Sequence, residues 1–143
     1  MDMLRIQARV GLPTTSDRIW DQIENLARWA EWNPVERDIT GTIAFGGKLS
    51  FVEQMDGLPP RQTRVSVVDW QPRAQLVWAE RRGFLFNTVR YFEIEEVGPE
   101  SCVFANGILL AGLRGELFHD RHRRALRDAT EAICQGMRTS LDL

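Results

Sequence analysis

The sequence has few cysteines and no long apolar run. Cys102 and Cys134 are the only two cysteines in 143 residues, and no CxxC pair is present. Thiols spaced in this way form neither a disulfide framework nor a zinc site, so we expect both to be reduced. The longest apolar stretch, near Ile108 to Ala111, is far too short to cross a bilayer, and the first five residues lack the apolar core of a signal peptide. These absences predict a cytoplasmic protein with no stable membrane insertion.

An excess of basic charge is also missing. The chain has 18 basic and 20 acidic residues and a formal net charge of -2, whereas a nucleic-acid-binding module normally carries a strong basic excess. This balance argues against nucleic acid as a partner. A chain of 143 residues with 43% hydrophobic side chains is long enough to close one core. We therefore expect a single domain over residues 1–143.

Aromatic side chains, by contrast, are plentiful. Seven Phe, five Trp and one Tyr give 13 aromatic residues. Each is large and shape-defining, so together they either fill a core or line a cavity.

The first third of the chain predicts a strand followed by two helices. Apolar and polar residues alternate from Leu4 to Val10, the period of a strand with one buried face. Thr15 or Ser16 can then cap a helix whose apolar residues recur every three to four positions. A second short helix is expected over residues 26–32, where Asn33-Pro34 ends it.

The remainder predicts six further strands and one long helix. Between residues 36 and 111, extended runs are separated by Gly- and Pro-containing turns, which is typical of an antiparallel sheet with one polar and one apolar face. Residues 116–141 have the period of a single amphipathic helix, about 39 Å long at about 1.5 Å per residue. Seven strands make a sheet about 34 Å wide at about 4.8 Å per strand. The helix can therefore lie across the whole apolar face of an α+β domain.

This order of elements is that of the helix-grip fold, and local residues agree with it. They resemble the polyketide cyclase/dehydrase-type families of the START-like (SRPBCC) superfamily. The resemblance implies a seven-stranded curved sheet around the C-terminal helix, with an apolar cavity that holds a small molecule. It rests on Ile19-Trp20-Asp21, Trp29, Trp32, Asn33, Pro34, Gly47 to Leu49, Pro72 to Trp78 and Gly112.

Arg90 is an unusual residue for the inner face of such a sheet. Glu93 and Glu95 belong in water, so Phe92 must face the core. Because side chains alternate between the two faces of a strand, Arg90 is turned inward as well. Hairpin closure at the adjacent turns places Arg90 opposite Trp78 and diagonal to Asn106. Arg90 either binds a carboxylate, phenolate or ketone oxygen of a ligand, or it extends to the edge of the sheet or pairs with a carboxylate of the chain. For the second reading, the expected partners are Glu80 and Glu53.

Two further polar residues are expected among apolar ones. Asn106 lies between Phe104 and Ile108 on one strand face, where its amide needs a partner from a ligand, a strand or a water. His122 falls in the apolar stripe of the long helix. It can bind a ligand or transfer a proton, or it can simply pack against a backbone carbonyl.

Metal and cofactor sites are not expected. His119 and His122 are three residues apart on the helix, but no further ligands recur at a useful spacing. No phosphate loop, dinucleotide fingerprint or nucleophile elbow is present.

The long helix also carries a cluster of arginines at positions 121, 123, 124 and 127. They form either a basic patch for RNA or anionic lipid, or a solvated face paired with Asp120, Asp128 and Glu131 at four-residue spacing. The interleaved acids favour the salt-bridged face.

We predict that the protein binds a small hydrophobic molecule (lipid, aromatic or polyketide-like) between the sheet and the long helix. One alternative is a polyketide-type cyclase or dehydratase with His122 and Arg90 as catalytic candidates, and a second is a protein-interaction domain. The cavity rim is expected at residues 57–60 and 82–86. The predicted ligand contacts are Arg90, Asn106, His122, Trp78, Phe92, Phe104, Phe118, Trp32 and Phe51.

Overall fold

The computed structural model describes residues 3–143 and confirms the predicted α+β helix-grip architecture. The described chain begins with β1 (Leu4–Leu12), α1 (Ser16–Glu24), the 3₁₀ turn η1 (Leu26–Arg28) and α2 (Trp29–Trp32). The six further strands are β2 (Glu36–Gly41), β3 (Lys48–Glu53), β4 (Arg61–Gln71), β5 (Gln75–Gly83), β6 (Phe86–Gly98) and β7 (Ser101–Ala111). The chain ends with α3 (Leu113–Ser140).

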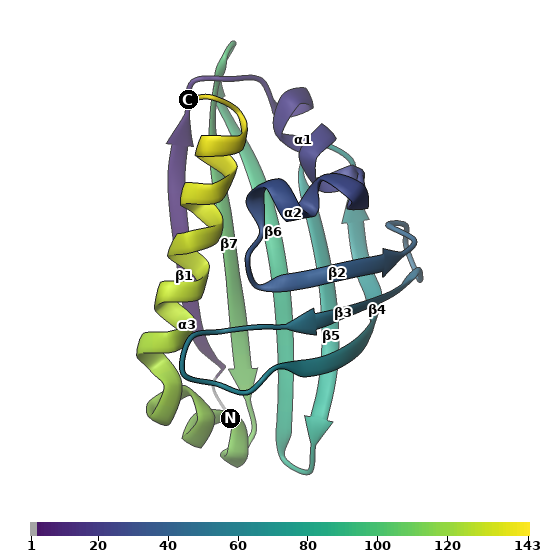
Figure 1. Cartoon of the computed structure of the whole chain (residues 1–143), viewed down its shortest axis with the longest axis vertical. Coiled ribbons are helices and arrows are strands. Elements are labelled where there is room, and N and C mark those ends of the chain that lie inside the picture. The colour runs from purple at the N-terminus through teal and green to yellow at the C-terminus, as the bar shows by residue number, and fades with distance from the viewer. Residues whose placement is uncertain (1–2) are drawn as a thin grey trace.

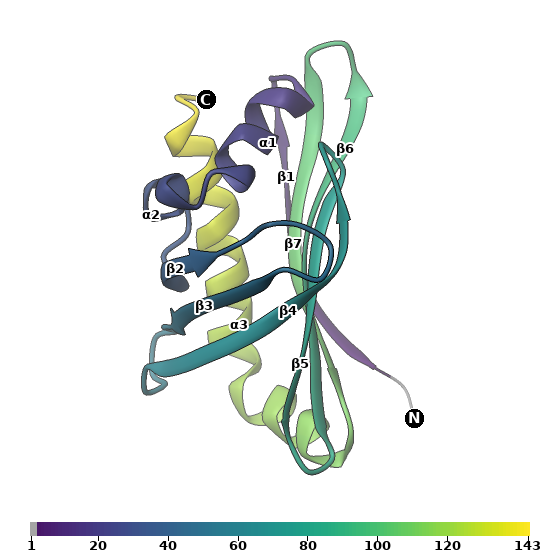
Figure 2. The same cartoon turned by 90° about the vertical axis from the view of Figure 1, so that its right-hand side faces the viewer.

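All neighbouring strands are antiparallel, in the order β1-β7-β6-β5-β4-β3-β2. The consecutive strands β1 and β2 therefore lie at opposite edges of the sheet, and α1 and α2 connect them. The sheet curls strongly, so that β2 and β3 run across the long strands β6 and β7 (Figure 1). Figure 2 shows α3 enclosed between this curled part and the strands β1 and β7.

The short helices form where the sequence predicts them. The side chain of Thr15 caps α1 by accepting a hydrogen bond from the backbone N–H of Arg18. The indole N–H of Trp29 donates to the carbonyl of Ile23 at 2.8 Å, and that of Trp32 donates to the carbonyl of Gln22 at 3.0 Å. These bonds tie α2 to α1 and satisfy two buried donors.

Helix α3 differs from the prediction of one uninterrupted helix over residues 116–141. It begins at Leu113, and His122 has non-helical angles (φ −118°, ψ 19°) that break its axis. The first turns are tied to the β5–β6 hairpin, because the carbonyl of Leu85 accepts hydrogen bonds from the backbone N–H groups of Arg114 and Gly115. The second segment packs against β1 and β7. The break lets one helix make both contacts.

The buried side of α3 consequently differs from the predicted stripe. In the second segment the buried residues include Leu126, Ile133 and Met137, as predicted, but also Thr130 and Cys134. Residues 118, 122, 125 and 129, which the stripe includes, are only half-buried.

An aromatic cluster fills the core between the sheet, α2 and the second half of α3. Its six members are buried, and neighbouring ring centroids lie 4.7–6.3 Å apart, the range of favourable aromatic pairs. We call these residues the aromatic cluster: Trp29, Trp32, Phe51, Trp78, Phe92 and Phe104. Within residues 3–143, none of the helices has the length and apolar character needed to cross a membrane.

Candidate functional site

The concave face of the sheet is divided into an aromatic half and a charged half. Near α1 and α2, inward positions belong to the aromatic cluster. Toward the β5–β6 hairpin, the same inward positions hold ionisable side chains from β3, β4 and β5. The predicted apolar inner face is therefore interrupted in this half by charged side chains beyond Arg90. The charged residues here are Glu53, Arg61, Glu80 and Arg82.

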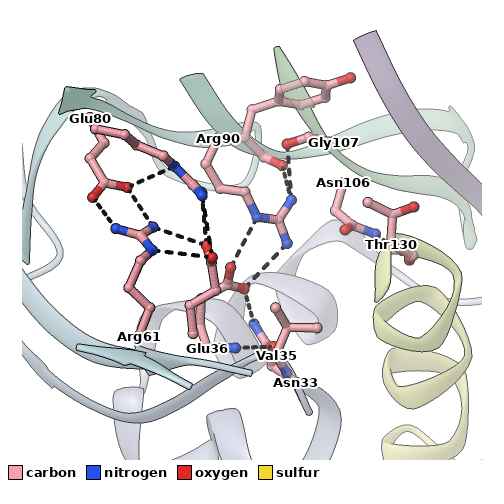
Figure 3. A network of polar contacts seen from close by, with 12 residues as sticks. Asn33, Val35, Glu36, Arg61, Glu80, Arg90, Asn106, Gly107 and Thr130 are labelled. Carbon is pink, nitrogen blue, oxygen red and sulfur yellow. Dashed lines mark hydrogen bonds and ion pairs between the residues drawn. The ribbon is translucent and has the colours of Figure 1, made fainter. Parts of the chain in front are cut away.

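Arg61 lies between two carboxylates in this charged half. Its guanidinium donates to Glu80 at 2.6 and 2.9 Å and to Glu53 at 3.3 and 3.4 Å (Figure 3). Burial opposes the charge of Arg61, but the hydrogen bonds and the attraction of the two carboxylates outweigh burial and raise its pKa. Arg61 is therefore a permanent cation that fixes both glutamates.

Arg82 is the most enclosed member of the charged half. Its side chain is only 8% exposed. Its guanidinium donates to Glu53 at 2.9 and 3.4 Å and lies 5.6 Å from the ring centroids of both Phe86 and Phe118. Its Nε is buried and lies 3.4 Å from a carboxylate oxygen of Glu80, with which it forms an ion pair, but it makes no well-aligned hydrogen bond within the described chain. Arg82 is thus paired by charge with both Glu53 and Glu80, while its Nε–H lacks a hydrogen-bond acceptor.

Arg90 faces inward, opposite Trp78 and diagonal to Asn106, as predicted. Its carboxylate partner, however, is Glu36 rather than Glu80 or Glu53. Arg90 Nε and Nη2 donate to the two carboxylate oxygens of Glu36 at 3.1 and 3.2 Å, and Nη1 donates to the carbonyl of Gly107 at 2.9 Å (Figure 3). Most of its five donors are therefore used within the protein.

Glu36 is held in place by a tight turn that precedes β2. The side-chain oxygen of Asn33 accepts hydrogen bonds from the backbone N–H groups of Val35 and Glu36, at 2.9 and 3.0 Å, and its amide donates to the Glu36 carboxylate at 2.9 Å. Sequence reasoning identified Asn33-Pro34 as a helix stop but missed this carboxylate. An asparagine three residues before an acid, at a helix end, is a usable signal for such a turn.

Sequence reasoning also missed the inward placement of Arg61 and Arg82. The signal was present, since the alternation that turns Trp78 inward on β5 also turns Glu80 and Arg82 inward. The guanidinium of Arg90 also lies over the ring of Phe92, 4.4 Å from its centroid.

Asn106 joins the sheet to α3. Its amide donates to the carbonyl of Thr130 at 2.9 Å and to Sγ of Cys134 at 3.3 Å, while its side-chain oxygen is buried and lacks a partner among residues 3–143. Burial raises the pKa of Cys134 to about 11, against the opposing effect of the Asn106 hydrogen bond.

His122 and Phe118 lie apart from Arg90 and Asn106. Their ring centroids are 4.6 Å from each other, near the charged half and the Gly57-Leu58 loop. A small cavity beside Arg90 is instead lined on the helix side by Leu126, Ala129 and Thr130. The structure therefore gathers the predicted residues into two groups. Arg90, Asn106, Trp32, Phe51, Trp78, Phe92 and Phe104 lie in or beside the core, and Phe118 and His122 lie near the start of α3.

Four spaces adjoin these groups. The cavity beside Arg90 has a volume of about 20 Å³, enough for one water. His122 lines a pocket of about 200 Å³ with Phe86, Phe118 and the arginines of the first turns of α3, and another of about 270 Å³ with the Gly57-Leu58 loop. A separate groove of about 570 Å³ lies between α2, β2 and α3, on the other side of the aromatic cluster.

The other two features of α3 that the sequence analysis singled out are its histidine pair and its arginine cluster. His119 contacts Asp120, and no group of three or more metal-ligating side chains occurs in residues 3–143. The predicted salt bridges of the arginine cluster are not formed. Across the described chain, none of Arg121, Arg123, Arg124 and Arg127 makes an ion pair.

Comparisons with known proteins find likeness in structure but none in sequence. No family model and no curated protein matches the sequence. The di-domain ARO/CYC protein BexL superposes with a TM-score of 0.77 at 10% identity, covering 99% of this chain and 47% of BexL. This chain therefore spans about half the length of that protein, and the same holds for the di-domain ARO/CYC protein StfQ.

Proteins of similar length match as well. Norcoclaurine synthase from Thalictrum flavum, in complex with dopamine and hydroxybenzaldehyde, has a TM-score of 0.71 at 12% identity over 98% of this chain and 87% of that enzyme. An uncharacterised protein from Rhizobium leguminosarum has a TM-score of 0.68 at 14% identity over 99% of this chain and 95% of its own. These matches show that this chain has the helix-grip fold that the ARO/CYC domains and norcoclaurine synthase also have.

Proposed function

We propose that this protein binds a small hydrophobic molecule between the charged half of the sheet and the first half of α3, around His122. The observation that carries the proposal is the position of His122. It lies at the break in α3 and lines two open pockets, of about 200 and 270 Å³, which share Arg121 and His122. Small-molecule sites usually measure roughly 300–1,000 Å³, so the two spaces joined are of suitable size.

The filled state of the aromatic half supports this location. The ring of Phe92 packs against those of Trp32 and Trp78, at centroid distances of 5.8 and 5.5 Å. Trp29 in turn packs against both tryptophans. A ligand there must displace several rings at once. In our proposal, Trp32, Phe51, Trp78, Phe92 and Phe104 form the rigid floor of the site.

Arg82 supplies the polar contact in this proposal. Its Nε is buried beside Phe118, the neighbour of His122, and lies 3.4 Å from Glu80 without a well-aligned hydrogen bond. A ligand oxygen that accepts from Nε supplies that hydrogen bond, and the rings of Phe86 and Phe118 contact the apolar body. Most polar groups of Arg90 and Asn106 are hydrogen-bonded within the protein. In our proposal these two residues therefore lie behind the surface that contacts the ligand.

A ligand that reaches inward from these two pockets requires the space behind them to widen, because the cavity beside Arg90 holds only one water. The break at His122 separates the first turns of α3 from the segment packed on β1 and β7. Movement of those first turns opens the gap without disturbing the aromatic cluster. We propose that the ligand enters there.

The location can be tested with the fluorescent probe 1-anilinonaphthalene-8-sulfonate. Ala125 lines the pocket of about 270 Å³, and Ala132 lines the separate groove of about 570 Å³. We expect Ala125→Trp to weaken probe binding severalfold and the control Ala132→Trp to leave it unchanged. Loss of binding in the control alone, or no binding to the parent protein, overturns the proposal. Native mass spectrometry of the protein from its own host tests independently for a bound molecule.

The cyclase or dehydratase alternative places proton transfer on His122. No hydrogen bond to the imidazole of His122 occurs in the described residues, whereas a general base is normally oriented by a partner. Binding without chemistry is therefore the function that the geometry favours.

A further inference from the structure

Four large apolar side chains are exposed together at one end of the molecule. Phe84 is 71% exposed, Leu85 42%, Leu113 52% and Leu117 60%. The first two form the tip of the β5–β6 hairpin, and the last two lie on consecutive turns of α3. Figure 2 shows the hairpin and the start of α3 at the same end of the molecule. We call these four residues the hairpin-end patch.

The fold itself does not require an apolar side chain at Leu85. Its backbone is left-handed (φ 55°), a conformation that glycine and asparagine adopt more readily than leucine. The carbonyl of Leu85 accepts hydrogen bonds from Arg114 and Gly115 at the start of α3, and any residue can provide that carbonyl. A leucine that is both strained and exposed points to a contact outside the chain.

Unpaired cations surround the patch. Arg81 lies on the hairpin, and Arg114 and Arg121 follow the patch leucines on α3, with Arg123 and Arg124 in the next turn. None of the five makes an ion pair within residues 3–143. The acids on these turns are Glu116 and Asp120, and Asp120 already contacts His119. Cations thus exceed acids here, although the whole chain has a net charge of -2.

We propose that the hairpin-end patch docks this protein onto an anionic lipid surface. Exposed Phe and Leu side chains flanked by arginines are the combination that binds at the headgroup boundary, where apolar groups enter the acyl region and guanidinium groups remain among the phosphates. The patch lies on a projecting hairpin tip and helix end, which can enter a bilayer surface to a shallow depth.

The positive charge around the hairpin-end patch favours an anionic lipid surface over a second copy of the chain as the partner. In a symmetric dimer the same patch occurs on both sides of the interface, so the five arginines of one copy face those of the other. Such like charges oppose association. An anionic lipid surface presents the opposite charge. The proposal does not depend on a bound ligand, and it shares Arg114, Leu117 and Arg121 with the lining of the pocket of about 200 Å³ in the proposed function.

Vesicle co-sedimentation tests the proposal. We expect the protein to sediment with vesicles of phosphatidylcholine and phosphatidylserine, but not with phosphatidylcholine alone, and to be released at about 1 M salt, where the Debye length is about 3 Å. Phe84→Ser combined with Leu117→Ser should weaken binding about tenfold. Arg114→Glu combined with Arg121→Glu should weaken it by about tenfold or more.

Matched controls use similar residues elsewhere. Phe45, in the β2–β3 loop, is 73% exposed, and Arg138 is exposed near the other end of α3. Phe45→Ser and Arg138→Glu should bind as the parent does, and thermal melting confirms that all variants are folded. The proposal is overturned if the parent fails to sediment with phosphatidylserine vesicles, or if the controls lose as much binding as the patch variants. It is also overturned if sedimentation velocity shows a parent dimer that the patch variants dissociate, with no vesicle binding.

Discussion

The guanidinium of Arg90, on β6, binds both carboxylate oxygens of Glu36, on β2, across 54 residues of sequence. Three strands, β5, β4 and β3, lie between these two in the sheet. The two side chains meet only because the sheet curls. The ion pair therefore fastens the edge strand to the middle of the sheet and stabilises the curvature that encloses α3.

Loss of Arg90 should strongly destabilise the protein. Arg90→Met leaves the buried Glu36 carboxylate with only the Asn33 amide as a side-chain donor. An uncompensated buried charge of this kind costs about 3–5 kcal/mol in free energy of unfolding. Urea unfolding followed by Trp fluorescence measures this loss.

Removal of both charges should be less harmful than removal of one. The variant Arg90→Met/Glu36→Leu leaves no unpaired charge, so its loss should be smaller than the sum of the two single losses. A double variant that loses the full sum would show that the two residues act independently.

The charged half predicts a contrast between two glutamates. Glu53 receives hydrogen bonds from both Arg61 and Arg82, and its side chain is largely buried. Glu53→Ala should cost about 3 kcal/mol, because it leaves the enclosed Arg82 with only its 3.4 Å contact to Glu80. The exposed pair of Arg9 and Glu95 is the control. Glu95→Ala should change the free energy of unfolding by less than about 1 kcal/mol, and equal losses would contradict the assignment.

Two glycines of α3 predict opposite responses to alanine. A Cβ at Gly136 would collide with the backbone carbonyl of Trp32, whereas a Cβ at Gly115 would meet its nearest atoms at 3.5–3.9 Å. Gly136→Ala should therefore cost about 1–3 kcal/mol. Gly115→Ala should be neutral or stabilise by up to about 1 kcal/mol, through helix propensity. Thermal unfolding of the two variants makes the comparison, and equal melting temperatures would contradict the close approach of α2 and α3.

Alkaline pH should destabilise the protein. Burial raises the pKa of Cys134 to about 11, and it also raises those of Cys102 and Tyr91. The unfolded chain releases the thiol protons near pH 9 while the native state keeps them. The stabilisation is therefore complete below about pH 9 and is lost as pH rises toward about 11. For Cys134 alone the loss at about pH 10 is about 1 kcal/mol.

Urea midpoints in reducing buffer at about pH 8 and about pH 10 measure this slope. Lys48 is the only lysine, so few other groups titrate in this range. Cys134→Ser removes a titrating thiol with little change in volume and should flatten the slope. A slope equal to that of the parent would exclude Cys134 as the cause.

The order of elements and the facing of side chains could be predicted because they depend on local periodicity. Alternation alone placed Arg90 inward, opposite Trp78 and diagonal to Asn106. The partner of Arg90 could not be found in this way. Glu36 reaches Arg90 only through the curl of the sheet, which no local pattern records.

The shape of α3 shows a similar limit. Its apolar period predicted a continuous helix with His122 facing the sheet, yet the break at His122 follows from contacts of its first turns with the β5–β6 hairpin. The same contacts brought Phe118 and His122 away from Arg90. Two of the predicted site residues therefore lie apart from the others because tertiary contacts, and not the sequence period, determine the backbone path at the start of α3.

The edge position of β1 has a consequence for how the chain folds. Leu4 pairs with Leu110 and Leu12 with Cys102, so within residues 3–143 the one strand partner of β1 is β7, about 100 positions later in the sequence. During synthesis β1 therefore stays unpaired until β7 has left the ribosome. Closing so distant a contact is slow. Until then Ile6 and Leu12 are exposed on the nascent chain, and exposed apolar strands of this kind favour aggregation.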